Sequence, residues 1–326
     1  MIISRTPLRM SLVGGGSDLP AYYRRQVGAV VSTAIDKYIY VNVNKKFDDG
    51  IRIGYSKNEE VASVDMIEHK LVRATINYLG LHGGIEITTI ADIPSKGTGL
   101  GSSSSFTVGL LNALSAFQGR HMSSERLGAD ACTIEIELCH EPIGKQDQYA
   151  AAYGGFNLIE FEPDERVIVS PIICSPHTRR TLQENTLILY TGITRSASAL
   201  LKEQTETVAG NGDKHRTLTS MVRLAYNLRD ELQLNNADSV GEILHENWIL
   251  KKSITSGIST PEIDDWYEAA RKAGAVGGKI LGAGAGGFLM LYAPVNRHDA
   301  IKAALPHLRH VPISFEPLGS RIIFFN

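Results

Sequence analysis

The sequence has few cysteines, no excess of one charge and no long apolar run. Its three cysteines provide neither a disulfide framework nor a zinc-binding pattern, which suits a reducing cytoplasm. The 33 Lys and Arg residues nearly balance the 35 Asp and Glu residues, so the footprint of a dedicated nucleic-acid binder is missing. No apolar run approaches the ~20 residues of a membrane-spanning helix. Arg5 and Arg9 interrupt the stretch where a signal peptide would be apolar. We therefore expect a cytoplasmic protein with neither a nucleic-acid nor a membrane partner.

Several sequence motifs of nucleotide-binding and hydrolytic proteins are also missing. The chain contains no Walker A pattern and no Gly-x-Ser-x-Gly nucleophile elbow. A literal Gly-x-Gly-x-x-Gly occurs at Gly282, Gly284 and Gly287, but the strand-like run FLMLY follows it. A dinucleotide-binding fold needs a helix at that point, so an oxidoreductase is disfavoured. A glycine turn between two strands, close to another backbone or to a ligand, fits better.

The length and the order of strand-like and helix-like segments predict a mixed α/β (α+β) chain of two domains. We place the boundary between residues 178 and 179, which gives domains 1–178 and 179–326. A helix capped by Ser123 should bury Leu127, Ala131, Ile134 and Leu138. The predicted strands are 38–44, 85–90, 186–191, 286–293 and 321–325. The other principal helices are predicted at 67–78, 106–117 and 218–232.

Glycine is the residue type in excess, with 31 residues against a background of ~7%. The glycines cluster at 14–16, at 97–101 and at 274–287. Such clusters occur where the backbone turns sharply or approaches something closely. Each cluster alone could be an ordinary turn, but three of them suggest three walls of one site.

The segment PSKGTGLGSSSS at 94–105 connects a predicted strand to a predicted apolar helix. The unpaired N–H groups and the dipole of a helix start make an anion site. The hydroxyls of Ser102 to Ser105 add donors and a possible Mg²⁺ ligand. A simple small-residue cap is the alternative, but this composition favours phosphate binding.

Acidic residues near these clusters complete a possible phosphoryl-transfer site. Asp147 lies in a polar triplet before an alanine-rich helix, and Glu135 borders the buried stripe of the preceding helix, with Glu137 as the competing choice. Asp18 follows the first glycine cluster and could instead cap a short helix. Two carboxylates, a hydroxyl and a phosphate loop form the minimal set for Mg²⁺-dependent phosphoryl transfer.

Four segments together resemble the motifs of the GHMP kinases: RTPLRMSLVGGGSDLPAY, PSKGTGLGSSSS, GKQDQYAAAYGG and KILGAGAGGF. They occur in the family's order and span residues 5 to 290. The resemblance implies an N-terminal ribosomal-S5-domain-2-like domain that binds ATP, a C-terminal α/β domain, and an active site in the cleft between them.

The resemblance also implies residue roles. Asp147 corresponds to the catalytic aspartate and Arg9 to an arginine near the transferring phosphate, which would keep Asp147 ionised or stabilise charge on the phosphate. Ser103 and Glu135 correspond to the Mg²⁺ ligands. The expected ATP-binding residues are Gly97, Thr98, Gly99, Leu100, Gly101, Ser102, Ser103 and Ser104. The expected substrate-binding residues are Gly15, Gly16, Ser17, Asp18, Arg195 and Gly284.

Within the family, the likeness to sugar 1-kinases is strongest. It implies ATP-dependent phosphorylation of the anomeric C1 hydroxyl of D-glycero-D-manno-heptose 7-phosphate, for GDP-heptose and surface polysaccharide synthesis, by a monomer or homodimer. Galactokinase-like members read Gly-Glu-His-x-Asp where this chain has Gly15-Gly16-Ser17-Asp18, so galactose is not assumed. Arg195 is favoured over the other basic candidates as the partner of the sugar phosphate. The alternatives are a fucose-type sugar 1-kinase, a non-sugar GHMP kinase and a non-catalytic sugar-binding regulator.

Overall fold

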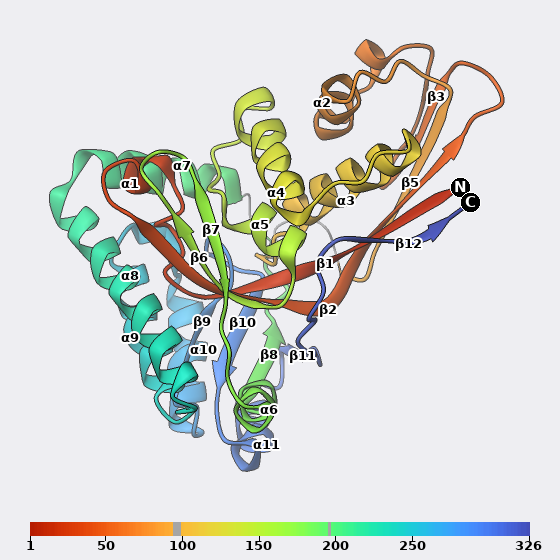
Figure 1. The fold of residues 1–326 in the computed structure, drawn as a ribbon. Helices are drawn as coiled ribbons and strands as arrows, with labels where there is room; N and C mark the ends of the chain where they lie inside the picture. Colours follow the sequence, from red (N-terminus) through yellow and green to blue (C-terminus); the bar gives the residue numbers. More distant parts are fainter. Residues whose placement is uncertain (94–98, 195–196) are drawn as a thin grey trace.

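Two long antiparallel strands, β1 (Ile2–Val13) and β2 (Gly28–Lys45), form the axis of the molecule (Figure 1). This computed structural model describes residues 1–93, 99–194 and 197–326. Burial alternates at the start of β1 and then becomes continuous from Thr6 to Val13. Helix α3 (Ser102–Phe117) packs on β1 and β2, and helices α8 (Gly212–Gln233) and α9 (Val240–Lys252) pack on β1 from the other half of the chain. Because β1 is covered on both faces, even its polar residues Thr6, Arg9 and Ser11 are buried, and each needs a hydrogen-bonding partner inside the protein.

The first sheet contains eight strands among the described residues, in the order β12-β1-β2-β5-β3-β4, with β6 on β2 and β7 on β6. β1 and β2 pair from Ile2–Val43 to Val13–Val31, and the register shifts directly after Pro7. Proline has no N–H for the ladder, so an irregularity beside it is expected. The remaining strands are β3 (Ile51–Gly54), β4 (Asn58–Val61), β5 (Ile85–Ala91), β6 (Phe156–Phe161), β7 (Val167–Pro171) and β12 (Arg321–Phe325).

The second sheet has the order β11-β8-β10-β9, and it lies below the first in Figure 1. Its strands are β8 (Thr186–Tyr190), β9 (Gly277–Ile280), β10 (Phe288–Tyr292) and β11 (Arg309–His310). The remaining helices are α1 (Pro20–Tyr23), α2 (Lys70–Tyr78), α4 (Ser124–Cys132), α5 (Gln146–Tyr153), α6 (Pro176–Glu184), α7 (Ala197–Gly210), α10 (Pro261–Lys272) and α11 (His298–Ala304).

The structure confirms the mixed α/β fold class and most predicted elements. The side chain of Ser123 caps α4 by accepting a hydrogen bond from the backbone N–H of Arg126, as predicted. The predicted burial of Leu138 is wrong, because 51% of its surface is exposed. After α4 the chain continues as a π-helical segment, Thr133–Leu138, whose wider turn moves Leu138 off the buried face.

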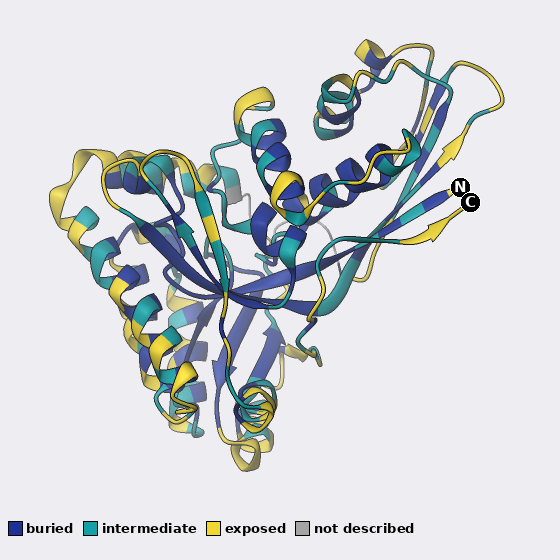
Figure 2. Cartoon of the chain, viewed as in Figure 1, coloured by how far each residue is buried: buried dark blue, intermediate teal, exposed yellow. Residues whose placement is uncertain are grey.

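One apolar core runs through both halves of the chain, from the strands of the first sheet to α8, α9 and the second sheet. In Figure 2 this core follows β1, β2 and the inner faces of the helices. The last strand, β12, returns from the second half and pairs with β1. The predicted division between residues 178 and 179 lies within α6 and stays a prediction.

No helix among the described residues is long and apolar enough to cross a membrane.

Two glycine-rich turns from opposite halves of the chain touch backbone to backbone. Gly99 precedes α3, and Gly282 lies in the turn between β9 and β10. Both have left-handed φ values, +74° and +75°, and a Cβ on Gly282 would lie 2.5 Å from the Gly99 Cα. This contact confirms the predicted close approach of the turn after residue 281 to another backbone.

We predict that Gly282→Ala destabilises the protein more than Gly80→Ala does. Gly80 is also left-handed, at φ +66°, but a Cβ there has no neighbour within 4 Å. Gly80→Ala therefore carries only the conformational cost, about 1–2 kcal/mol. Gly282→Ala adds the overlap with Gly99, worth about 1–3 kcal/mol more. Urea unfolding of the two variants and the wild type gives the loss in free energy of unfolding for each variant. Equal losses in the two variants would show that the contact between Gly282 and Gly99 is not tight.

Candidate active site

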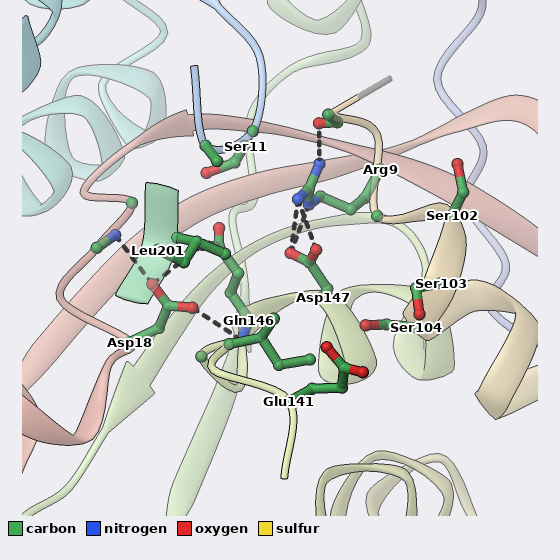
Figure 3. Close-up of a pocket in the computed structure, with 18 of the residues that line it drawn as sticks. Arg9, Ser11, Asp18, Ser102, Ser103, Ser104, Glu141, Gln146, Asp147 and Leu201 are labelled. Carbon is green, nitrogen blue, oxygen red and sulfur yellow. Dashed lines mark hydrogen bonds and ion pairs between the residues drawn. The ribbon is translucent and has the colours of Figure 1, made fainter. Parts of the chain in front are cut away.

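A cavity of about 180 Å³ opens where β1, the start of α3, the segment leading into α5 and three parts of the second half meet (Figure 3). Those three parts are α7, α9 and the turn between β9 and β10. Most of the residues predicted for the site contribute to its walls. These are Arg9, Gly15, Gly16, Asp18, Gly99, Gly101, Ser102, Ser103, Ser104 and Asp147. The structure therefore brings residues from three distant segments of the predicted site into one cavity. Gly97, Thr98 and Arg195 lie outside the described residues.

An ion pair between Arg9 and Asp147 lies in the middle of the cavity wall (Figure 3). The Arg9 Nε donates to Asp147 Oδ1 at 2.8 Å and Nη2 donates to Oδ2 at 2.7 Å. The third guanidinium nitrogen, Nη1, donates to the Gly99 carbonyl at 2.7 Å. Arg9 is only 3% exposed, so both strand β1 and the loop before α3 hold it in one orientation. Paired N–H···O bonds of this kind fix the plane of the carboxylate.

The start of helix α3 forms a second part of the wall. Gly101 stands before the helix with a left-handed φ of +73°, and Ser102, Ser103 and Ser104 form its first turn. A Cβ at Gly101 would lie 3.2 Å from Arg9 Cγ and 3.3 Å from Asp147 Oδ2, so glycine permits this close approach. The N-terminal end of this 16-residue helix, where the helix dipole is positive, therefore faces the same cavity as the ion pair.

Glu135 lies behind the serines and is completely buried. Ser103 Oγ donates to its carboxylate at 3.0 Å, Ser104 Oγ at 2.7 Å, Thr107 Oγ1 at 3.1 Å and Gln148 Nε2 at 2.6 Å. Burial raises its pKa to about 7, and the donors oppose that rise. The competing candidate, Glu137, is exposed. Glu135 thus contacts Ser103 as expected, but it supports the wall from behind and does not line the cavity.

Asp18 marks the end of the cavity opposite Ser103 (Figure 3). Its Oδ1 accepts hydrogen bonds from the Gly16 N–H at 2.9 Å and from Gln146 Nε2 at 3.0 Å. Burial raises its pKa, and the negative charge of Asp147 adds to this effect. A Cβ at Gly144 would overlap the carboxylate, so only glycine at 144 leaves room for Asp18.

Besides Glu135, three predicted residues within the described part of the chain do not line the cavity. Ser17 Oγ is used inside the turn, where it donates to the Gly14 carbonyl at 2.8 Å and accepts from the Ala29 N–H at 3.0 Å. The Leu100 side chain is 1% exposed, and its carbonyl accepts from the Arg9 N–H. A Cβ at Gly284 would lie 2.6 Å from the Ile258 carbonyl, so Gly284 packs against Ile258. The structure therefore gives these three packing or turn contacts outside the cavity wall, and their direct contact with a ligand stays a prediction.

Sequence reasoning missed Gln146, Lys251 and Gln148, all of which belong to the site or its support. Gln146 and Lys251 line the cavity, and Gln148 donates to Glu135. A signal for Lys251 was available, because it continues the buried helical stripe of Leu244 and Trp248 in α9. No comparable pattern marks the two glutamines.

A second cavity, of about 670 Å³, lies on the far side of the α3 start and shares Ser102 and Ser103 with the first. Apolar and aromatic side chains form much of its wall. They include Ile39, Tyr55, Leu71, Ile90, Ile93 and Phe106. The His69 ring lies 5.2 Å from the Phe106 ring, centroid to centroid. Its size and apolar lining suit a flat organic group.

No cluster of three or more His, Cys, Asp or Glu side chains within residues 1–93, 99–194 and 197–326 could hold a metal ion by itself. Any metal at this site would therefore rely on hydroxyls and on a ligand's own oxygens as well as on carboxylates.

We predict that Glu135 makes stability depend on pH. Its pKa is about 7 in the folded protein against an ordinary value of 4.5, so the folded state binds the proton more tightly than the unfolded state. The stabilisation from this difference is therefore complete below pH 4.5 and is lost as the pH rises through 7. At ~1.4 kcal/mol per pKa unit the loss totals about 3 kcal/mol. Glu135→Gln removes this titration. We would measure the free energy of unfolding by urea, without divalent metal, from pH 4.5 to 8. Over this range the variant should become more stable relative to the wild type by about that amount. A difference in unfolding free energy that does not change with pH would contradict the assignment.

Comparison with known proteins agrees with this geometry. The family model described as GHMP kinases N terminal domain matches residues 67–155, and the one described as GHMP kinases C terminal matches residues 228–309. A D-glycero-alpha-D-manno-heptose 7-phosphate kinase of Campylobacter jejuni is 30% identical over 93% of this chain and 92% of its own length. A crystal structure of a D-glycero-D-manno-heptose 1-phosphate kinase from Bacteroides thetaiotaomicron has a TM-score of 0.81 at 25% identity and covers 100% of both chains.

A bifunctional relative, L-fucokinase/L-fucose-1-P guanylyltransferase of Bacteroides fragilis, is 26% identical over 90% of this chain but only 34% of its own length. The match at 30% identity over nearly the full length of both chains is enough to assign the family. This chain belongs to the GHMP kinases and, with sugar kinases among its relatives, is a phosphotransferase that acts on a hydroxyl group.

Proposed function

We propose that the chain is an ATP-dependent kinase that phosphorylates the anomeric C1 hydroxyl of D-glycero-D-manno-heptose 7-phosphate. The product is the 1,7-bisphosphate, which would lead to GDP-heptose for surface polysaccharide synthesis. The observation that carries the proposal is the position of Asp147, held by Arg9 between Asp18 and the start of α3. The heptose phosphate kinases among the relatives support the choice of sugar.

In this proposal the start of α3 binds the phosphates of ATP. Ser102, Ser103 and Ser104 line the cavity at the N-terminal end of the helix, where the helix dipole favours an anion. The nucleoside would enter the second cavity, because that cavity shares Ser102 and Ser103 with the first and is lined by rings and aliphatic side chains. The γ-phosphate would then point toward Arg9 and Asp147.

Ser103 and Glu135 would hold Mg²⁺. Both supply the oxygen ligands that this ion prefers, and the Ser103 hydroxyl is both at the cavity wall and within 3.0 Å of Glu135. A buried carboxylate with a raised pKa also fits a place where a cation compensates its charge. When bound, Mg²⁺ neutralises charge on the phosphate oxygens.

Asp147 acts as the base. It accepts the proton of the C1 hydroxyl as the hydroxyl oxygen attacks the γ-phosphorus, and ADP departs with the bridging oxygen. Arg9 holds the Asp147 carboxylate in one plane through two N–H donors. The donors at the α3 start stabilise the charge that develops on the transferred group.

Asp18, Gly15 and Gly16 form the sugar end of the site in this proposal. The Asp18 carboxylate would accept hydrogen bonds from sugar hydroxyls. The glycines leave the space that a larger side chain would fill, since a Cβ at Gly15 would lie 3.3 Å from Ser11 Oγ and 3.7 Å from Gln146 Nε2. Binding of the 7-phosphate by Arg195 stays a prediction.

We predict that Asp147→Asn lowers kcat by about 10²–10⁴-fold, because an amide cannot accept the proton. Asp164→Asn is the matched control. Asp164 also pairs with an arginine, with Arg166 Nε at 2.7 Å, but on an exposed hairpin. The control should keep wild-type kcat in a coupled ADP-release assay. An Asp147→Asn variant that folds and keeps near-wild-type kcat would remove Asp147 from the role of base.

The substrate is tested with a panel of sugars and sugar phosphates in the same assay, followed by phosphorus NMR of the product. We expect turnover of D-glycero-D-manno-heptose 7-phosphate and two product signals, one of them from a phosphate on the anomeric carbon. Preferred turnover of L-fucose would instead assign the chain to the fucose-type kinases. Sugar binding without ATP turnover would support the non-catalytic regulator.

A further inference from the structure

Two buried lysines connect the second half of the chain to the first. Lys251 of α9 is 4% exposed and donates to the Gly15 carbonyl at 3.0 Å. Lys279 of β9 is 1% exposed and donates to the Ser11 carbonyl at 2.9 Å. Burial of a lysine ammonium is costly unless its N–H groups are satisfied. Surface solubility therefore does not explain why lysine stands at these two buried positions.

The two lysines differ in what they face. Lys251 lines the central cavity, whereas Lys279 does not. An ammonium has three N–H donors. In the described part of the chain the Lys251 ammonium makes one hydrogen bond, to Gly15, so it keeps donor capacity for a molecule in the cavity. Burial lowers the pKa of Lys251 to about 8, and the negative charge of Asp18 opposes that change.

Asp18 supplies the matching acceptor. Its Oδ1 accepts from Gly16 and from the Gln146 side chain, whereas among the described residues Oδ2 has only a long contact, 3.4 Å, with the Gln146 N–H. One end of the cavity thus offers an ammonium with spare donors beside a carboxylate with a spare acceptor. A polyol fits this pair, because one hydroxyl can accept from the ammonium while its neighbour donates to the carboxylate.

A phosphate group fits this end of the cavity less well. The carboxylate of Asp18 offsets the charge of Lys251, and the carboxylates of Asp147 and Glu141 line the same cavity. Arg9 is engaged with Asp147 and with the Gly99 carbonyl. A dianionic group near Lys251 would therefore meet acceptors and negative charge.

We propose that Lys251 is a substrate-binding residue that donates to a hydroxyl oxygen of the sugar, while Asp18 accepts from the adjacent hydroxyl. The proposal rests on the proposed sugar kinase function. It adds a contact from the second half of the chain, so that the sugar is held by both halves. Lys279 supports the structure and does not touch the substrate.

The test compares Lys251→Met with Lys279→Met. Methionine is close to lysine in length and suits a buried position. Each variant loses one buried ammonium and its hydrogen bond to a backbone carbonyl, that of Gly15 or that of Ser11. With D-glycero-D-manno-heptose 7-phosphate we expect Lys251→Met to raise the sugar KM by about 10–100-fold, the loss of a charged hydrogen bond. Its KM for ATP should stay within about twofold. Lys279→Met should keep the sugar KM within about twofold, while its melting temperature should fall about as much as that of Lys251→Met.

Lys251→Gln keeps a neutral N–H donor and should give an intermediate KM, which also guards against a Lys251→Met variant that fails to fold. Protection of each variant against thermal unfolding by added sugar provides a second readout, independent of turnover. An unchanged sugar KM in folded Lys251→Met, or an equal rise in Lys279→Met, would overturn the proposal. A KM rise confined to the phosphorylated sugar, and absent for the unphosphorylated heptose, would overturn it in favour of phosphate recognition.

A wild-type protein that turns over no sugar would count against the proposed function. Sugar-dependent protection of the wild type that is lost in Lys251→Met would still support the binding role in that case.

Discussion

The paired hydrogen bonds between Arg9 and Asp147 connect the central strand β1 to helix α5, and the arrangement of the site depends on them. The guanidinium is buried and also reaches the Gly99 carbonyl, so one side chain positions the carboxylate and the loop before α3 together. Gly101 has no Cβ, and this absence lets the helix start approach both partners. The carboxylate, the helix dipole and the serine hydroxyls are therefore in position before any ligand binds, which lowers the reorganisation that a reaction would require.

The serines of α3 hold this arrangement from two directions. Ser103 and Ser104 line the cavity and donate to the buried Glu135, while Ser105 donates to the Pro7 carbonyl of β1 at 2.8 Å. The first turn of the helix is thereby tied both to the π-helical segment and to the central strand. A buried polar network of this kind restricts motion when its members are satisfied. Glu135 has four donors, which explains how a carboxylate is tolerated at a position with no exposure.

The second half of the chain completes the cavity through a few close contacts. Gly282 touches Gly99 where no side chain would fit, and Lys251 and Lys279 reach backbone carbonyls of the first half. These contacts explain why a single core extends across both halves. The end of the cavity at Asp18 contains groups from both halves, whereas the end at the start of α3 is built mainly by the first.

The sequence by itself determined the mixed α/β class, most of the strands and helices, and the three segments that meet at the site. Periodicity and helix-start chemistry are local properties, so a short stretch of residues carries them. The roles of Arg9, Asp18, Ser103 and Asp147 were predicted from the resemblance of their segments to the GHMP kinase motifs, since the local pattern around Arg9 and Asp18 is weak evidence by itself. Only the tertiary structure decided the direction of individual side chains. Ser17 turns inward while Asp18, its neighbour, faces the cavity, and Lys251 comes to the sugar end from a helix more than 200 residues away in the chain. Such outcomes depend on how distant backbones approach each other, and no local pattern in the sequence records that distance.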